Sequence, residues 1–271
     1  MAKVFVIDVA RCTGCYNCQL ACKDEHCGND WTPYAKPQPE TGQFWCRVEE
    51  YVRGAIPKVK IHYISKICNH CANAPCIPAA KNGAVYRRDD GLIIIDPEKA
   101  AGQRQIAGSC PYGAVYFNEA LNLPQKCTGC AHLLDHGAKL PRCVDACPTD
   151  AMRFGEEAEL AELTAGAVVL RPETGAAPQV YYRNIPGMFI GGTVYDPVRE
   201  EIIEGASCRL QSGGKTWRTA TDEFGDFWFT DLPVGVFELA VDAKGYRTRV
   251  FAALKTDESL NLGDIALDAC D

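Results

Sequence analysis

The feature that most constrains this chain is a run of four closely spaced cysteines near its N-terminus. Residues 12–22 read C-T-G-C-Y-N-C-Q-L-A-C, a C-x2-C-x2-C-x3-C pattern. This spacing binds [4Fe–4S] clusters, because three thiolates on one tight loop reach three different irons, while the fourth Cys ligates a neighbouring cluster. A second group lies far along the chain, at Cys127, Cys130, Cys143 and Cys147-Pro148. The two groups are therefore expected to meet in the fold.

Zinc and disulfides are the alternative uses of clustered cysteines. A structural zinc site usually draws its ligands as two separated pairs around one tetrahedral ion, and three cysteines this close would crowd it. A disulfide framework requires an oxidising compartment, and residues 1–8 lack the apolar segment and cleavage site of a secretory signal. The spacing therefore favours iron–sulfur clusters.

Composition narrows the class of protein further. The chain has 271 residues, of which 47% are hydrophobic and 23% charged, enough for two globular domains. Its formal net charge of −7 argues against a nucleic-acid partner, which would need a basic surface. No apolar segment approaches the roughly 20 residues that cross a bilayer. We expect a cytoplasmic protein, unless a partner chain carries an export signal for both.

A third cysteine loop, C-x2-C-x4-C, occupies residues 68–76, and Cys110-Pro111 follows without three preceding cysteines of its own. Ala80 stands where a fourth Cys would complete the loop, and positions 100, 103 and 106 hold Ala, Gln and Ile. If loops exchange their fourth cysteines in pairs, loss of one three-Cys loop also removes the need for Cys at position 80. Cys110 then remains because it serves the loop of residues 68–76.

The twelve cysteines then divide into three ligand sets, each for one [4Fe–4S] cluster. Set one is Cys12, Cys15, Cys18 and Cys147; set two is Cys68, Cys71, Cys76 and Cys110; set three is Cys127, Cys130, Cys143 and Cys22. The remaining four, Cys27, Cys46, Cys208 and Cys270, are expected to pack as small apolar side chains.

The predicted fold class is α+β, with a ferredoxin-like domain at residues 1–155. We expect a strand at 3–9, a short helix at 16–25, an irregular insertion at about 27–66, and a hairpin at 84–96 turning at an Asp-Gly pair. The Trp- and Pro-bearing insertion either packs on a partner or covers the clusters from water.

Beyond the cysteines, residues 156–186 read as a short helix (156–163) and a linker. Short alternating runs between turn signals then predict an all-β sandwich at 187–271. It carries no catalytic or cofactor constellation, so a docking or spacer role is the simplest interpretation.

No catalytic residue is predicted on this chain. It has no G-x-G-x-x-G dinucleotide fingerprint between strand and helix, and no Ser/His/Asp set is singled out by spacing. Among its five histidines, His70 and His132 lie beside cluster loops and are the ones expected to tune a cluster potential.

The C-N-H-C-x4-C loop, the closing C-P-Y-G and the late C-x12-C-x3-C-P resemble the iron–sulfur subunits of molybdopterin oxidoreductases related to dimethyl sulfoxide reductase. The resemblance covers about residues 1–185 and departs from the family's four-cluster pattern at positions 80, 100, 103 and 106. It implies electron transfer as the activity of this chain.

The C-terminal sandwich resembles the transthyretin-like or carboxypeptidase-regulatory module, notably at 205–207, 221–225 and 232–235. Together with the missing cluster, it is similar to the small subunits of the pyrogallol–phloroglucinol transhydroxylase branch. That resemblance implies a heterodimer whose large catalytic subunit holds molybdenum on two molybdopterin guanine dinucleotides. The alternatives are a subunit of another molybdopterin oxidoreductase, acting on phenols or an inorganic substrate, and a stand-alone polyferredoxin.

Overall fold

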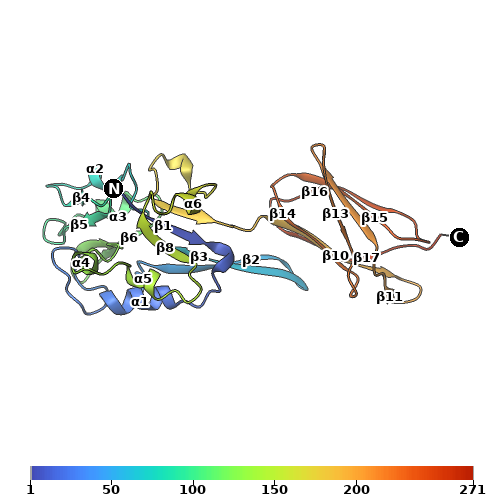
Figure 1. Ribbon diagram of the computed structural model, residues 1–271, viewed down its shortest axis with the longest axis horizontal. Helices are drawn as coiled ribbons and strands as arrows, with labels where there is room; N and C mark the ends of the chain where they lie inside the picture. The colour runs from blue at the N-terminus through green and yellow to red at the C-terminus, as the bar shows by residue number, and fades with distance from the viewer. Residues whose placement is uncertain (1, 271) are drawn as a thin grey trace. The chain divides into compact units, whose positions relative to one another are not determined.

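The computed structural model describes residues 2–270, which divide into two compact units. The first runs from the N-terminus to Glu50 and from His62 to Ile185, and the second comprises Tyr51–Ile61 and the chain from Pro186 onward (Figure 1). Short helices and strands make up the first unit and strands the second, so the fold class is α+β. Within residues 2–270, no helix has the length and apolar character needed to cross a bilayer.

The centre of the first unit is a three-stranded sheet in the order β8-β1-β9. Strand β1 (Lys3–Asp8) pairs antiparallel with β8 (Met152–Glu156) and parallel with β9 (Val180–Arg183). Residues 4–7 of β1 are all buried, as expected for a central strand covered on both faces. Because β1 leads into the first cysteine loop and β8 follows Cys147, this pairing brings the two ends of the cysteine-rich region together.

Single-turn helices and tight hairpins carry the other cysteine loops. The predicted helix after the first loop is α1 (Asn17–His26), and the predicted hairpin at 84–96 is confirmed by the pairing of β4 (Val85–Arg87) with β5 (Ile93–Ile95). The remaining elements of this region are η1 (Val9–Arg11), α2 (Cys76–Ala79), α3 (Gln105–Gly108), β6 (Val115–Asn118), β7 (Leu123–Lys126), α4 (Ala131–Asp135) and α5 (Arg142–Asp145).

The insertion expected to be irregular over 27–66 is irregular only in its first half. Strands β2 (Arg47–Ala55) and β3 (Lys58–Lys66) form a two-stranded hairpin, whose tip at 51–61 belongs to the second unit. There the Lys58 ammonium, 5% exposed, lies 2.6 Å from an Asp226 carboxylate oxygen, and Asn261 donates to the Ala55 carbonyl. Gly54 has φ +82°, and a Cβ at this position would meet the Phe189 ring. The glycine and the Pro57 that follows interrupt the strand pattern in the sequence, so the hairpin leaves no clear local signal.

The segment at 156–186 also differs from the expectation of a helix and a linker. Helix α6 (Ala161–Thr164) is a single turn, because residues 157–160 form a turn after β8. A 3-10 turn, η2 (Pro172–Thr174), follows. Residues 180–183 are strand β9 of the central sheet rather than linker.

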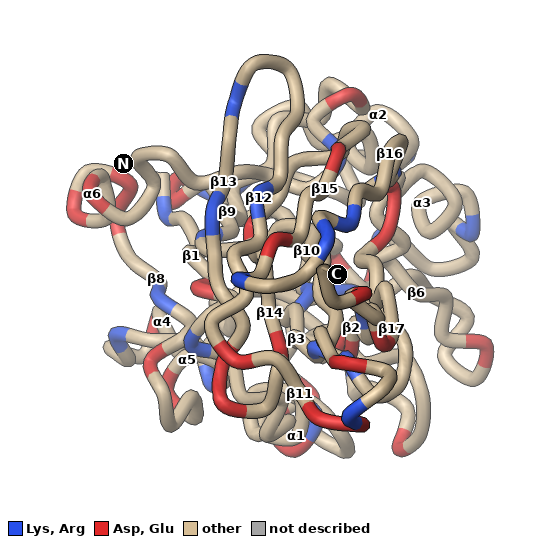
Figure 2. Tube along the Cα trace, turned by 90° about the vertical axis from the view of Figure 1, so that its right-hand side faces the viewer, with Lys and Arg blue, Asp and Glu red and all other residues tan. Residues whose placement is uncertain are grey.

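The second unit contains the predicted β-sandwich. Its core lies between two four-stranded sheets, with side chains such as Ile190, Leu210, Phe227 and Leu239 fully enclosed. Basic residues lie along β12 and β13, while acidic residues predominate around β11 (Figure 2). One sheet is formed by β10 (Met188–Asp196), β11 (Glu201–Ile202), β14 (Asp226–Leu232) and β17 (Leu260–Ala266), and the other by β12 (Ser207–Ser212), β13 (Lys215–Ala220), β15 (Val236–Asp242) and β16 (Arg249–Lys255).

Candidate metal centres

The four thiols of set two line one apolar-walled cavity, beside Pro111 and Tyr112. Burial and the neighbouring thiols raise the pKa of Cys71 to about 12 and that of Cys76 to about 11. Thiols that resist ionisation this strongly become thiolates when a metal supplies the counter-charge. No carboxylate lines the cavity. The donor set, four soft sulfurs and no carboxylate, therefore fits an iron–sulfur cluster.

Set three is the most deeply enclosed. Burial raises the pKa of Cys22, on α1, well above the usual value, and the thiols of Cys127, Cys143 and Cys130 add to the shift. The thiols of set two stand around a cavity. Within residues 2–270, no three His, Cys, Asp or Glu side chains are placed to hold a single metal ion. The fourth ligand predicted for set three, Cys22, thus lies with its distant partners.

Set one lies nearer the surface. Burial raises the pKa of the Cys12 thiol, and both Cys18 and Cys147 contribute to the shift, so the distant Cys147 reaches this loop. Cys15 is exposed. Gly14, between Cys12 and Cys15, has φ +68°, and a Cβ at this position would lie 2.6 Å from the Tyr63 ring. The tight turn that presents these thiols therefore requires glycine.

The positions where a fourth cluster loop would lie are filled by packed side chains. Ala100 and Ile106 are fully buried in an apolar cluster that also contains Ala84 and Val85, with Ala80 against it. The Gln103 amide bonds to the backbone of Lys81 and Lys99. The positions that hold cluster ligands in the family's four-cluster pattern are thus occupied here by packed apolar side chains and a hydrogen-bonded amide.

Sets three and one are bridged by Cys46, which the sequence suggested to be an ordinary apolar side chain. Cys46 is 1% exposed, and its thiol is within hydrogen-bonding reach of Cys18 in set one and of Cys143 in set three. The Cys46 thiol lowers the pKa of Cys18 to about 6, with help from Ser65 and against the effect of burial. Nothing in the spacing of Cys46 signals this placement, since it belongs to no loop.

His70 replaces glycine at a recurring loop position. The second residue after the first Cys of each loop is Gly14, His70 and Gly129, with φ of +68°, +42° and +64°. A histidine in this conformation is strained by roughly 1–3 kcal/mol. Its Nδ1 accepts the Ile93 N–H at 3.0 Å, which places the proton on Nε2, an atom with no partner among the described residues. Burial lowers the pKa of His70 well below its usual value, so the ring is neutral.

A stack of aromatic rings from the insertion covers set three. Trp31 stacks on His132 at 4.2 Å, and Trp45 lies 4.7 Å from His26, whose Nε2 is 3.9 Å from the Cys130 sulfur. These contacts place two tryptophans of the insertion against the two histidines beside set three, whereas sequence reasoning overlooked His26. Burial lowers the pKa of His26 to about 3.

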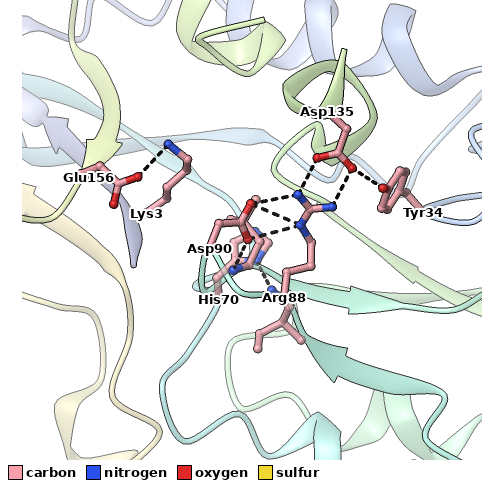
Figure 3. A network of polar contacts seen from close by, with 9 residues as sticks. Lys3, Tyr34, His70, Arg88, Asp90, Asp135 and Glu156 are labelled. Atoms are coloured by element: carbon pink, nitrogen blue, oxygen red, sulfur yellow. Dashed lines mark hydrogen bonds and ion pairs between the residues drawn. The ribbon is translucent and has the colours of Figure 1, made fainter. Parts of the chain in front are cut away.

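Buried charge anchors the loop that follows Cys130. His132 bonds to Glu25 at 2.9 Å, and Arg142 binds the other oxygen of that carboxylate at 2.7 Å. At the end of α4, Asp135 holds Arg88 through two oxygens and also accepts from Tyr34 (Figure 3). Arg88 in turn binds Asp90. This network ties the insertion, the β4-β5 hairpin and α4 together around the thiols.

The three other cysteines outside the ligand sets differ in exposure. Cys208 is buried inside the sandwich, Cys27 is half-buried and Cys270 is exposed. None of the sixteen cysteines, all within the described range, forms a disulfide.

Comparison with known proteins covers both units. The family profile of the 4Fe-4S dicluster domain matches residues 59–157, and that of the carboxypeptidase regulatory-like domain matches residues 190–268. The sequence is 40% identical to the pyrogallol hydroxytransferase small subunit of Pelobacter acidigallici, over 97% of this chain and 98% of that one. It is 32% identical to a chain of the anaerobic dimethyl sulfoxide reductase of Escherichia coli, over 64% of this chain and 90% of that one.

A third relative is a subunit of the sulfite dehydrogenase of Allochromatium vinosum, 33% identical over 65% of this chain and 80% of that one. The reductase and dehydrogenase relatives align over about two thirds of the chain, whereas the small subunit from Pelobacter aligns over nearly all of it. The chain therefore belongs to the iron–sulfur electron-transfer subunits of the molybdopterin oxidoreductases related to dimethyl sulfoxide reductase.

Proposed function

We propose that this chain is the electron-transfer subunit of a molybdenum enzyme that acts on phenolic aromatics. The observation that carries the proposal is the similarity to the pyrogallol hydroxytransferase small subunit, which extends through both the cysteine-rich region and the sandwich. The substrate is converted on a large partner subunit that holds molybdenum on two molybdopterin guanine dinucleotides. The smaller chain contributes no catalytic residue.

The twelve cysteines of sets one, two and three hold three [4Fe–4S] clusters in this proposal. Such clusters supply single-electron transfer, with potentials set by charge, hydrogen bonds to sulfur and exposure. The chain's own residues fix the thiols in place and exclude water. Support comes from the convergence of each set and from the packed side chains at positions 80, 100, 103 and 106.

Set one is the place where the chain offers its redox centre to the partner. Cys15 is exposed, and the adjacent Tyr16 and Leu20, one helical turn apart, are 37% and 60% exposed. An apolar patch around an exposed ligand suits a protein interface, because docking covers both the apolar side chains and the thiolate.

A second candidate is service to a different molybdopterin oxidoreductase, with another phenol or an inorganic substrate. It is supported by the relatives that match only the cysteine-rich region. The sandwich favours the phenol-converting enzyme, because the relative that also aligns over this domain is the hydroxytransferase subunit. A stand-alone polyferredoxin is the third alternative, and it would need no partner.

Anaerobic purification of the tagged chain from its native host tests the proposal. We expect a larger chain and molybdenum to co-purify, and the complex, but not the reconstituted chain alone, to convert a trihydroxybenzene. The reconstituted chain should hold about twelve irons, four for each cluster. Purification without a partner, or phenol conversion by the chain alone, would overturn it.

A further inference from the structure

A buried lysine lies at the junction of sets two and three. Lys126, the last residue of β7, is 2% exposed. Its ammonium donates to the carbonyl oxygen of Ile93 and, at 2.9 Å, to that of Cys127. Among the ion pairs of residues 2–270, none joins Lys126 to a carboxylate. The protein thus encloses a cation and gives it only neutral hydrogen-bond acceptors.

An enclosed ammonium needs a compensating negative charge. Transfer of an unpaired charged group into the protein interior costs several kcal/mol, and two carbonyl dipoles recover part of this. The contacts of the Lys126 ammonium reach both ligand sets, because Cys127 belongs to set three and Ile93 lines the cavity that contains the thiols of set two.

The two sets are themselves neighbours at this point. Cys68 of set two is among the thiols that act on Cys127 of set three. Set one has a different environment, because the side chains beside its Cys18 and Cys147 sulfurs are the hydroxyls of Ser65, at 3.6 Å, and Thr149, at 3.8 Å. The junction of sets three and one contains the neutral thiol of Cys46. The junction of sets two and three therefore contains a cation, whereas the junction of sets three and one contains an uncharged thiol.

We infer that Lys126 is a shared counter-cation for the clusters of sets two and three and raises the reduction potential of both, while leaving that of set one unchanged. The inference rests on the proposed cluster content. Its physical basis is that reduction adds one negative charge to a cluster, and a cation nearby stabilises the reduced form more than the oxidised form. One side chain thereby shifts two of the three potentials upward and leaves the third where it is.

His70 supports this assignment through a shared backbone residue. The Ile93 N–H is bound by His70 Nδ1, while the Ile93 carbonyl accepts from Lys126. Arg87, whose guanidinium donates to the Cys71 and Ala72 carbonyls at 2.7 Å, is a further cation near set two, and it is unchanged in the Lys126 variants. The β4-β5 hairpin fixes both contacts, because Ile93 is the first residue of β5.

The test is a redox titration of the purified complex, followed by paramagnetic resonance, for Lys126→Met, Lys126→Arg and Lys99→Met. In Lys126→Met we expect two of the three signals to be reduced only at lower potential. The ratio of reduced to oxidised cluster at a fixed potential should fall at least tenfold, which corresponds to about 59 mV for one electron. The third signal should not move. Lys126→Arg keeps the charge and should titrate like wild type.

Lys99→Met is the matched control, because Lys99 is 56% exposed and already paired with Asp96. It should move no signal. Iron analysis covers the case in which Lys126→Met fails to assemble: loss of two clusters in this variant but not in Lys126→Arg supports the inference. Unchanged potentials, a shift of all three signals, or loss of the set-one cluster would overturn it. A wild-type iron content other than about twelve would instead refute the proposed cluster count.

Discussion

Cys110 is the residue on which the assignment of set two depends. It lies 34 positions beyond Cys76 (110 − 76) in a C-P pair without its own loop, yet it lines the same cavity as Cys68, Cys71 and Cys76. The Cys110 thiol therefore lies beside the three thiols of the loop at 68–76, the position predicted for the fourth ligand of set two.

Replacing Cys110 with Ser should remove or convert one cluster and leave two. We expect the reconstituted chain to lose up to roughly a third of its iron and one of its three paramagnetic signals, because the hydroxyl is a harder and weaker ligand for iron than the thiolate. Cys270→Ser, at an exposed cysteine outside all sets, should change neither. An unaltered iron content in Cys110→Ser would contradict the assignment of set two.

Cys46 should influence two clusters without ligating either. Replacing it with Ala removes a hydrogen-bonding thiol from Cys18 and Cys143, and loss of hydrogen bonds to ligand sulfur lowers a cluster potential. We expect the signals of sets one and three to titrate at lower potential with full iron content retained. Cys46→Ser, which restores a donor, should return them toward wild type. A cluster lost in Cys46→Ala would mean that this residue is itself a ligand.

At the scale of elements, a buried ion pair is one of the contacts that hold the tip of the β2-β3 hairpin. Lys58 is 5% exposed, and its ammonium contacts Asp226 on β14 and lies over the Trp228 ring. Burial opposes the ionisation of Asp226, but the hydrogen bonds from Lys58 and Thr193 lower its pKa overall. The carboxylate form therefore stabilises the folded tip.

Asp226→Asn should loosen the hairpin tip at neutral pH. It leaves a buried ammonium without its counter-charge, which we expect to destabilise the tip by about 2 kcal/mol. Hydrogen exchange over residues 51–61 measures this, with exposed Asp264→Asn on β17 as control. Because the folded pKa of Asp226 is depressed, its contribution is present above pH of about 4 and lost as the pH falls through the folded pKa. A difference that persisted at lower pH would contradict this cause.

The elements predicted from the sequence are those specified by local patterns. Helix α1 follows a cysteine loop, and the β4-β5 hairpin turns at Asp90-Gly91. Strand β9 is not predictable in this way, because its partner β1 is the start of the chain and a four-residue parallel pairing leaves no local signal. Burial of Lys126 could not be predicted either. A lysine is expected at the surface, and only its neighbours in space show that this one is enclosed.

At the scale of the whole molecule, the cysteine sets and the sandwich belong to different units. None of the twelve proposed ligands lies beyond Cys147. The tip at 51–61, however, is part of the second unit, so the sandwich is not simply an appendage that begins at residue 187.

Truncation before Gly187 should leave the iron content intact and expose the hairpin tip. The tip loses Asp226, Phe189 and Asn261 together. We therefore expect a new site of limited proteolysis within 51–61, measurable by mass spectrometry, and weaker association with the large subunit. Full-length chain treated in parallel should resist cleavage there. Loss of iron on truncation would show that the sandwich is needed to retain the clusters.

The pairing of β1 with β8 and β9 has a consequence for biogenesis. Set two is drawn from one contiguous stretch, residues 68–110, whereas set one needs Cys12 and Cys147, and its supporting sheet also needs residues 180–183. A chain leaving the ribosome can therefore close set two while most of it is still being synthesised, but set one stays open until Cys147, just over half of the 271 residues, has emerged, and its supporting sheet until residues 180–183 follow. The redox centre offered to the partner is the last that the nascent chain can complete.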